Sequence, residues 1–313
     1  MYNRCKTLNE TLSSLMGDMT SGSLSWKELT KSNEEVLFAQ EVANLSQDSF
    51  GKIEENMQDY EGLIYDGPFS EHMTNPEILG LGDTIYKDED ARKVIYDFVA
   101  EDKIKEITYN GIVDGTIRSH SYNVSLNDDS MYYINISERD GKVLFMNYPK
   151  PIGEIRISKE KANALALEFL DEHGFKNMKE SYFTNENGML TINYAYEQNG
   201  VICYTDLIKV KVALDDGAII GLETKSYLSS HRQRQIAEPK ITKEEAKKKI
   251  NPKLEIISEG MAIIPTDWQT ELTTYEFKGK VGENNFIVYI NTQNGKEEKV
   301  FMIIDTPGGT LAI

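Results

Sequence analysis

The sequence predicts an α+β fold in which a helical N-terminal region precedes one helix-plus-sheet unit repeated three times. Three observations support this prediction. The first 60 residues lack proline and carry apolar residues at helical spacing. Three later helix starts align on an alanine, and three Asp-Gly or Asn-Gly turns follow them at nearly constant spacing. Self-similarity at a fixed period indicates a repeated structural unit.

The N-terminal region, residues 1–60, is predicted to form a helical hairpin. The Gly-Ser stretch at 21–25 separates a short leucine stripe from a longer seam with steps of three and four. Such a seam either packs within the chain or pairs two chains in a homodimer. The seam consists of Val36, Ala39, Ala43, Ser46, Phe50, Ile53, Met57 and Tyr60.

Three helices are predicted to begin at Lys87, Ser158 and Thr242. In the first two, apolar residues recur at offsets 0, 3, 4, 7 and 8 from an alanine, which gives each helix one buried face. The third is cut short by Pro252, because proline cannot continue a helix. Ser158 is a predicted N-cap, and Thr242 with Glu245 has capping-box spacing.

Each helix is followed by strand-like segments that contain a tight hairpin turn. The turns lie at Gly141, Gly217 and Gly295, which are 76 and 78 positions apart. Asp-Gly and Asn-Gly accept the positive φ of such turns. The segments KVLFMNY and AIIGLETKSY that follow the first two turns are rich in strand-forming residues. Each unit is therefore expected to lay one helix across its own antiparallel sheet.

These patterns set the expected domain limits. We place a connector at 61–84 and two short proline-marked joints around 148–155 and 231–241, which read as compact rather than flexible. The helical region is 1–60, and the three repeats are 85–149, 155–230 and 240–313.

The composition excludes several functions. Acidic residues outnumber basic ones by 51 to 34, for a net charge of −17, which disfavours nucleic acid and anionic membranes. Cys5 and Cys203 are too far apart in sequence for a zinc or redox motif. No apolar stretch is long enough to span a membrane, so we expect the chain as given to be soluble.

The connector contains the string LIYDGPFSEHM at 63–73, whose Asp66, Glu71 and His72 are candidates for acid–base catalysis. The alternative is structural, because Gly67-Pro68 favours a turn and Ser70 can cap a helix. Catalytic groups usually converge from separate segments, so we interpret the string as a folded connector and interface element. Its candidate partner-binding residues are Tyr65, Asp66, Pro68, Phe69, Glu71 and His72.

The basic stretch SHRQRQ at 230–235 adds Arg232 and Arg234, which can bind carboxylates of a partner or simply solvate the joint. Motifs of serine hydrolases, metalloproteases and nucleotide-binding proteins are absent from the sequence. We therefore predict no catalytic residue, no metal, no cofactor and no enzymatic activity. The alternative is a hydrolase of cell-wall polymer that uses paired carboxylates.

The string LIYDGPFSEHM, the three repeats and the ending YEFKGKVGENNFIVYINTQNGKEEKVFMIIDTPGGTLAI together resemble the YpeB family of spore-germination proteins. The resemblance implies three tandem PepSY-like repeats. Members of the family begin with a membrane-spanning helix, so this chain resembles the remainder without that anchor. The sequence departs from the family at Tyr60-Glu61-Gly62, where a tandem proline is expected.

The same resemblance implies a function. Family members work with the cortex-lytic enzyme SleB, which degrades spore peptidoglycan at germination. They are thought to stabilise or inhibit that enzyme in the dormant spore and to be clipped at germination. By resemblance, the protein is a non-enzymatic regulatory partner of SleB on the cortex side of the spore inner membrane.

Overall fold

The computed structural model describes residues 78–266, 270–306 and 309–312. The chain divides into two compact units, 1–64 and 65–313, and the described residues belong to the second. The predicted helical hairpin at 1–60 and most of the connector lie outside the described residues and stay predictions.

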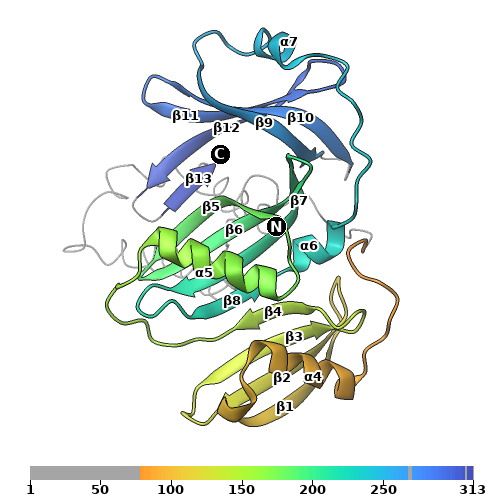
Figure 1. The fold of residues 1–313 in the computed structure, drawn as a ribbon, viewed down its shortest axis with the longest axis vertical. Helices are drawn as coiled ribbons and strands as arrows, with labels where there is room; N and C mark the ends of the chain where they lie inside the picture. The colour runs from red at the N-terminus through yellow and green to blue at the C-terminus, as the bar shows by residue number, and fades with distance from the viewer. Residues whose placement is uncertain (1–77, 267–269, 307–308, 313) are drawn as a thin grey trace, which may run out of the picture. The chain divides into compact units, whose positions relative to one another are not determined.

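The described part is a mixed α+β structure, as predicted, with few helices and a large sheet (Figure 1). Its elements run as a helix followed by four strands, three times over, and we call these three groups the first, second and third modules. The first module is α4 (Asp88–Phe98), β1 (Ile104–Val113), β2 (Ser119–Leu126), β3 (Met131–Ser137) and β4 (Val143–Asn147). The second is α5 (Lys159–Glu172), β5 (Met178–Glu186), β6 (Met189–Gln198), β7 (Val201–Ala213) and β8 (Ile219–Glu223). The third is α7 (Lys243–Lys247), β9 (Glu255–Pro265), β10 (Glu271–Val281), β11 (Asn284–Asn291) and β12 (Glu297–Thr306), followed by β13 (Gly309–Ala312).

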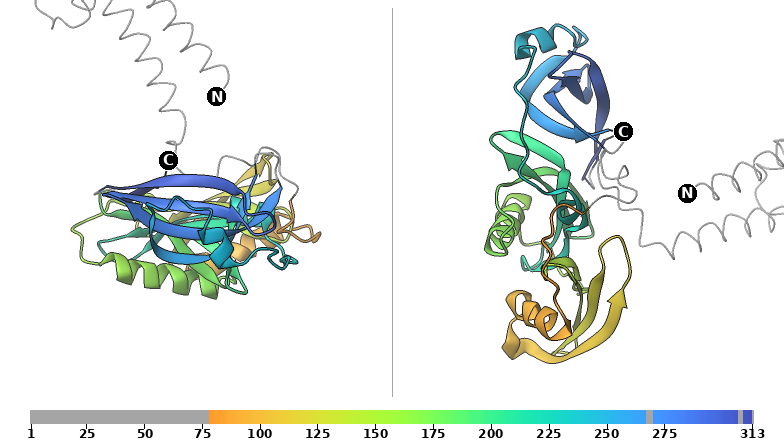
Figure 2. Two further views of the ribbon diagram at one scale, coloured as in Figure 1. Left: turned by 90° about the horizontal axis from the view of Figure 1, so that it is seen from above. Right: turned by 90° about the vertical axis from the view of Figure 1, so that its right-hand side faces the viewer.

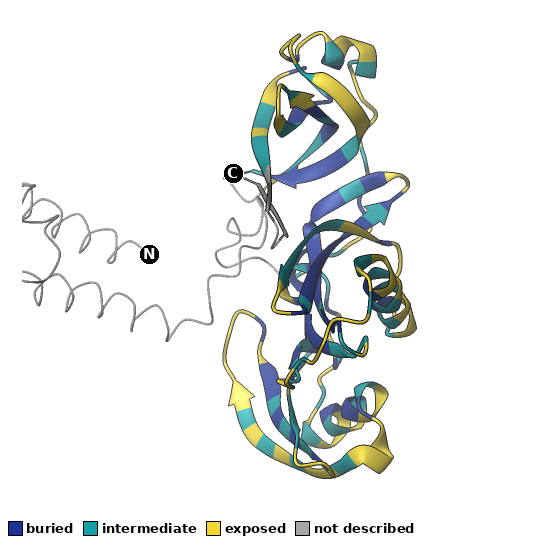
Figure 3. Ribbon diagram, turned by 90° about the vertical axis from the view of Figure 1, so that its left-hand side faces the viewer, coloured by how far each residue is buried: buried dark blue, intermediate teal, exposed yellow. Residues whose placement is uncertain are grey.

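The helices pack through the faces that the sequence predicts. Ala91 and Ile95 of α4 are fully buried, as are Ala162, Ala166 and Leu170 of α5. Helices α4 and α5 lie on the same side of the strands and turn their polar sides outward (Figures 2 and 3). The predicted caps are also present. The Ser158 side chain accepts from the Lys161 backbone N–H, and Thr242 with Glu245 forms a reciprocal capping box.

The three glycine turns are confirmed. Gly141, Gly217 and Gly295 have φ values of +58°, +81° and +72°, which side chains rarely adopt. Each glycine lies between two paired antiparallel strands of one module: β3 and β4, β7 and β8, or β11 and β12. One strand prediction is wrong at its end. AIIGLETKSY forms β8 only as far as Glu223, and Lys225–Ser230 forms a short helix, α6.

The sheets of the modules are joined, whereas the sequence predicted a separate sheet for each unit. Strand β4 pairs with β8 through three residue pairs, 145–147 with 221–223, so the first and second modules share one sheet. Each of these strands is the last of its module, and pairing satisfies backbone groups that an edge strand leaves open.

The second and third modules close into a ring of eight strands. The order is β7-β6-β5-β13-β12-β11-β10-β9, and β9 returns to pair in parallel with β7. Two short contacts close this ring: Val201–Cys203 with Met261–Ile263, and the pair Thr184 with Gly309. Strand β7 therefore pairs with β9 through its first residues and with β8 through its last.

The ring has an apolar interior of its own, separate from the core beneath α4 and α5. It is formed by Ala195, Tyr204, Leu207, Ala262, Ile264 and Tyr289. Within it the Glu276 carboxylate accepts hydrogen bonds from the Tyr204 hydroxyl at 2.6 Å and the Tyr289 hydroxyl at 2.9 Å. Burial raises the pKa of both tyrosines well above the ordinary value, so both hydroxyls stay protonated and donate.

Candidate functional site at the joint between the second and third modules

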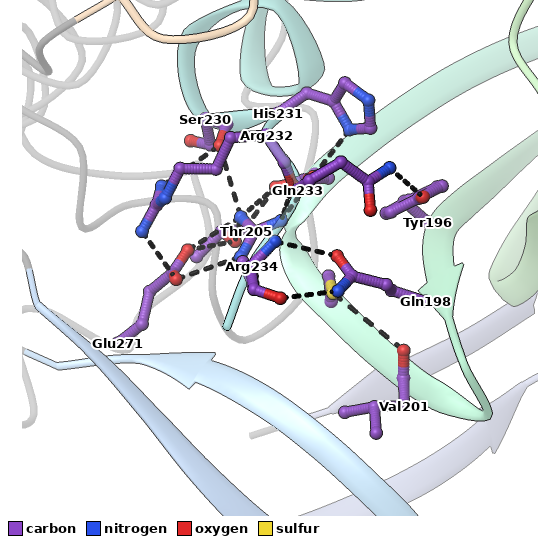
Figure 4. Close-up of polar contacts among 12 residues, drawn as sticks. Tyr196, Gln198, Val201, Thr205, Ser230, His231, Arg232, Gln233, Arg234 and Glu271 are labelled. Atoms are coloured by element: carbon purple, nitrogen blue, oxygen red, sulfur yellow. Dashed lines mark hydrogen bonds and ion pairs between the residues drawn. The ribbon is translucent and has the colours of Figure 1, made fainter. Parts of the chain in front are cut away.

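The joint after α6 is organised around the guanidinium of Arg234 (Figure 4). Its Nη1 and Nη2 donate to the two Asp206 oxygens at 2.8 and 2.6 Å. Its Nε and Nη2 donate to the two Glu271 oxygens at 2.9 and 2.7 Å. Arg234 thus makes a two-bond contact with each of two carboxylates, the geometry in which arginine binds carboxylates most strongly.

A bulge in β7 positions the first of these carboxylates. Ala195 pairs with Leu207 while the next residue, Tyr196, pairs with Cys203, so Tyr204–Asp206 are extra residues in β7. The bulge frees Thr205 and Asp206 from the regular ladder and turns them to the joint. The Thr205 hydroxyl lies 3.1 Å from an Asp206 oxygen and 2.9 Å from a Glu271 oxygen.

The second carboxylate belongs to another module, since Glu271 is the first residue of β10. It also accepts from Arg232 Nη2 at 2.8 Å. The joint therefore links β7 of the second module to β10 of the third through side chains. The chain segment between the modules supplies both arginines.

Further contacts hold the backbone of Arg234 and the imidazole of His231. The Gln198 amide accepts from the Arg234 N–H at 3.0 Å and donates to the Arg234 carbonyl at 2.7 Å. His231 Nδ1 lies 3.0 Å from Asp206 Oδ2, and its ring stacks on Tyr227 at 4.1 Å. These contacts leave the segment 231–234 little conformational freedom.

The charges of this network are buried to different degrees. The Asp206 side chain is 0% exposed and Arg234 is 4% exposed, whereas Arg232 is 40% exposed. Burial alone would lower the pKa of Arg234, but its hydrogen bonds and its attraction to Glu271 and Asp206 raise it above the ordinary value. The guanidinium is therefore charged at every accessible pH, and it compensates the buried Asp206.

This geometry changes the interpretation of one predicted partner-binding residue, Arg234. The other predicted partner-binding residues stay candidates. Arg234 binds carboxylates of its own chain and is buried, so it is not a partner contact in this structure. Arg232 is half-exposed and stays a candidate. The six candidates from the connector, Tyr65, Asp66, Pro68, Phe69, Glu71 and His72, lie outside the described residues.

The described end of the connector joins the first two modules. The N–H groups of Leu79 and Gly80 donate to carbonyls of α6, at Ser229 and Leu228. A side chain at Gly80 would lie 2.7 Å from the Leu228 oxygen, so only glycine fits there. Arg139, in the β3–β4 turn, donates to the carbonyls of Leu81 and Gly82.

The other joint, between β4 and α5, is held by Asp215. Its carboxylate accepts from the Gly153 N–H at 2.9 Å and pairs with Lys150 Nζ at 3.1 Å. The Gly153 N–H, and then the Lys150 ammonium, lower the pKa of Asp215 to about 2 although burial opposes the shift. Both joints are therefore tied to the second module by charged hydrogen bonds.

Sequence reasoning missed the acidic partners of Arg234. Asp206 is the only acidic residue in the largely apolar strand VICYTDLIKVKVA, and a carboxylate in a buried strand signals a buried ion pair. Glu271 carries no comparable signal, because it follows directly on a polar loop. The carboxylates of Asp206 and Glu271 both bind the guanidinium of Arg234, and this contact stabilises the joint. The two carboxylates of a glycosidase instead flank the bond that is cleaved, in an open cleft.

Comparison with known proteins places this architecture in a family. Residues 46–237 match the model of the YpeB sporulation family, covering its PepSY1 and PepSY2 domains. The chain belongs to the YpeB family. The match covers the first two modules and more than half of the chain.

Relatives of the family extend the likeness. The sporulation protein YpeB of Halalkalibacterium halodurans is 32% identical over 216 residues, covering 68% of this chain and 48% of that protein. The YpeB of Bacillus subtilis is 32% identical over 186 residues, covering 57% of this chain and 41% of that protein. The chain thus spans less than half the length of either relative.

A solved structure of the family shares the fold. The C-terminal domain of Bacillus megaterium YpeB aligns with a TM-score of 0.62 at 29% identity. The alignment covers 71% of this chain and 99% of that domain. The mixed α+β arrangement is therefore the fold of the YpeB C-terminal domain, while the residue limits of the three predicted repeats stay predictions.

Substituting Arg234→Met is expected to destabilise the protein by about 3–5 kcal/mol, because Asp206 would remain buried without its cation. Arg232→Ala serves as the control and is expected to cost less than about 1 kcal/mol, since that ion pair is half-exposed. Urea unfolding followed by circular dichroism measures both. Equal losses in the two variants would contradict the central role of Arg234.

Acid is expected to loosen the joint held by Asp215. A carboxyl whose pKa is lowered in the folded state stabilises the protein above its unfolded pKa of about 3.9. That contribution is lost as the pH falls through the folded pKa of about 2. An NMR titration of the Asp215 carboxyl carbon in the Lys150→Met variant should show a higher pKa than in the wild type.

The matched control for that titration is Lys176→Met, because Lys176 pairs with Asp171 on the surface and does not contact Asp215. This variant should leave the Asp215 titration unchanged. An Asp215 titration that is identical in all three proteins would exclude Lys150 as a cause of the lowered pKa.

Proposed function

We propose that the chain is a non-enzymatic regulatory protein of spore germination that stabilises or inhibits the cortex-lytic enzyme SleB until germination. The observation that carries this proposal is the match of residues 46–237 to the YpeB sporulation family. The pairing with SleB follows from the resemblance, and the structure supports it by offering a preorganised platform for a protein partner.

The platform is rigid for a physical reason. Arg234 fixes the joint between the second and third modules, and the ring of eight strands holds the same two modules together. Surfaces that do not reorganise lose little conformational entropy on binding. Inhibition then needs no chemistry and only an interface burying on the order of 1,600 Å² in total.

The charge of the chain suits one class of partner. A net charge of −17 attracts a partner with a basic face and speeds their encounter at low salt. Arg232 is the described candidate for a contact with a carboxylate of such a partner. The further candidates lie in the connector, outside the described part: Tyr65, Asp66, Pro68, Phe69, Glu71 and His72.

The proposed site of action rests on the resemblance to the YpeB family. We place the protein on the cortex side of the spore inner membrane, where the anchor of family members would hold it. Among the described residues, none of the helices has the length and apolar character needed to cross a bilayer. A homodimer through the predicted helices at 1–60 is compatible with this placement.

Proteolysis within a joint is the proposed mechanism of release, at 149–155 or 231–240. Within the second joint, the structure favours one stretch as the site of cleavage. Residues 231–234 are held by Arg234 and Gln198, whereas Ala237, Glu238 and Pro239 are exposed and lie beyond that network. A cut at 237–239 leaves the contact between Arg234 and Glu271 in place, so the two fragments should stay together.

This expectation can be tested by inserting a recognition sequence for a site-specific protease between Ala237 and Glu238. After complete cleavage, the two fragments should elute together in size-exclusion chromatography. The same insertion combined with Arg234→Met should give fragments that separate at a lower urea concentration than the wild-type fragments, because only the strand pairing of the ring still joins them. Separation of the wild-type fragments would show that cleavage of this joint is itself sufficient for release.

The function is tested by measuring muropeptide release from spore cortex by SleB, with and without this protein. The expected result is a dose-dependent suppression of release by SleB, and no release by this protein alone. Unchanged release by SleB would reject the inhibitory role. Release by this protein alone would instead establish the cell-wall hydrolase and direct attention to Asp66, Glu71 and His72.

A further inference from the structure

The C-terminal ends of α4 and α5 meet at the imidazole of His173, although the two helices belong to different modules (Figure 1). His173 is the residue that caps the end of α5. Its Nδ1 lies 2.7 Å from the carbonyl oxygen of Phe169, in the last turn of α5. Its Nε2 lies 3.0 Å from the carbonyl oxygen of Asp97, in the last turn of α4. One side chain therefore links the first module to the second through the backbone of both helices.

Both contacts of this imidazole need a proton on the ring. A carbonyl oxygen only accepts hydrogen bonds, so each ring nitrogen must donate. The neutral imidazole has one N–H group, whereas the protonated imidazolium has two. His173 can thus donate to both helices only when it is protonated. In the neutral form, one nitrogen turns its lone pair toward a carbonyl oxygen, and that contact is lost.

The other histidines of the described part are placed differently. His120 Nε2 lies 2.8 Å from the Tyr86 carbonyl oxygen, and its Nδ1 lies 3.1 Å from the Tyr109 hydroxyl. A hydroxyl can donate, so a neutral imidazole satisfies both contacts of His120. His231 contacts the carboxylate of Asp206 with its Nδ1. Among the described histidines, only His173 has carbonyl oxygens at both ring nitrogens.

The surroundings of His173 suit a cation. The C-terminal end of a helix carries a partial negative charge, and here two such ends converge. The rings of Phe98 and Phe169 lie 4.1 and 4.3 Å from the imidazole, between ring centroids. Both are within the roughly 6 Å over which an aromatic ring attracts a cation near its face.

The charged side chains of the two helix ends act in the same direction. Within the described part, the hydrogen bonds and ring contacts of His173 come from α4 and from its own helix end. The charged residues within four positions of Asp97 or His173 are all exposed: Lys93, Asp97, Glu101, Asp171, Glu172 and Lys176. These are four carboxylates and two ammonium groups, a net charge of −2, which favours a cation between the helices.

We propose that His173 is a pH-sensitive link between the first and second modules, formed when its imidazole is protonated and weakened when it is neutral. The sheets of these modules are joined through only three residue pairs, 145–147 with 221–223, so a further contact between the modules matters. Histidine is the side chain that ordinarily changes its charge between pH 5 and 8, near pH 6.5. The link is therefore complete below about pH 6.5 and weakens as the pH rises, because only the protonated ring donates to both helices.

The test measures amide hydrogen exchange at Val99 in the full chain. The Val99 N–H donates to the Ile95 carbonyl at 2.9 Å and closes the turn of α4 that carries Asp97. Its protection factor, corrected for the intrinsic exchange rate at each pH, should fall about tenfold between pH 5.5 and pH 8.0, because hydrogen bonds to charged groups are strong. Equal protection at the two pH values would overturn the proposal.

Three variants show whether His173 is the group that responds. His173→Lys keeps a positive charge at both pH values, and His173→Phe keeps an aromatic ring but cannot donate. Neither should show the fall in protection at Val99. The matched control is His231→Gln, which removes a histidine from the other joint and should retain the fall. A fall that persists in either His173 variant, or that disappears in His231→Gln, would overturn the proposal. Since SleB takes no part in this experiment, its result is independent of the proposed function.

Discussion

The described structure depends on the compensation of one buried negative charge, that of Asp206. An unpaired carboxylate in the interior costs several kcal/mol, so the chain must bring a cation to it. Arg234, in the segment after α6, supplies this cation. Its second pair of hydrogen bonds fixes Glu271 of β10. One electrostatic requirement thus fixes the path of the joint and the placement of the third module against the second.

The edges of the sheets are likewise arranged so that few backbone groups stay unpaired. Three modules with separate sheets would leave six edges open, and open edges favour aggregation. Pairing of β4 with β8 and closure of the eight-strand ring remove most of them. What remains for a partner, within the described residues, is the outer edge of β1 and the free edge at the start of β9.

Local patterns predicted local structure well. The α+β class, the buried alanines of α4 and α5, the capping box at Thr242 and the three glycine turns depend on residues close together in sequence, and periodicity and turn chemistry report them directly. The joining of the sheets and the partners of Arg234 depend on residues 28 to 125 positions apart, which no periodicity reveals. The helix α6 was missed because KSYLSS has no strong helical pattern and is held by packing of Tyr227 and Leu228.

The ring of eight strands also constrains how the protein folds. Thr184 of β5 must find Gly309 of β13, and these residues are separated by 125 positions. Contacts between such distant residues are slow to form, since the entropy of closing the loop is lost before the contact stabilises anything. During synthesis from the N-terminus, the free edge of β7 stays unpaired until β9 has been made, and that of β5 until β13 has been made. The four-residue strand β13 therefore decides when the ring of eight strands first closes.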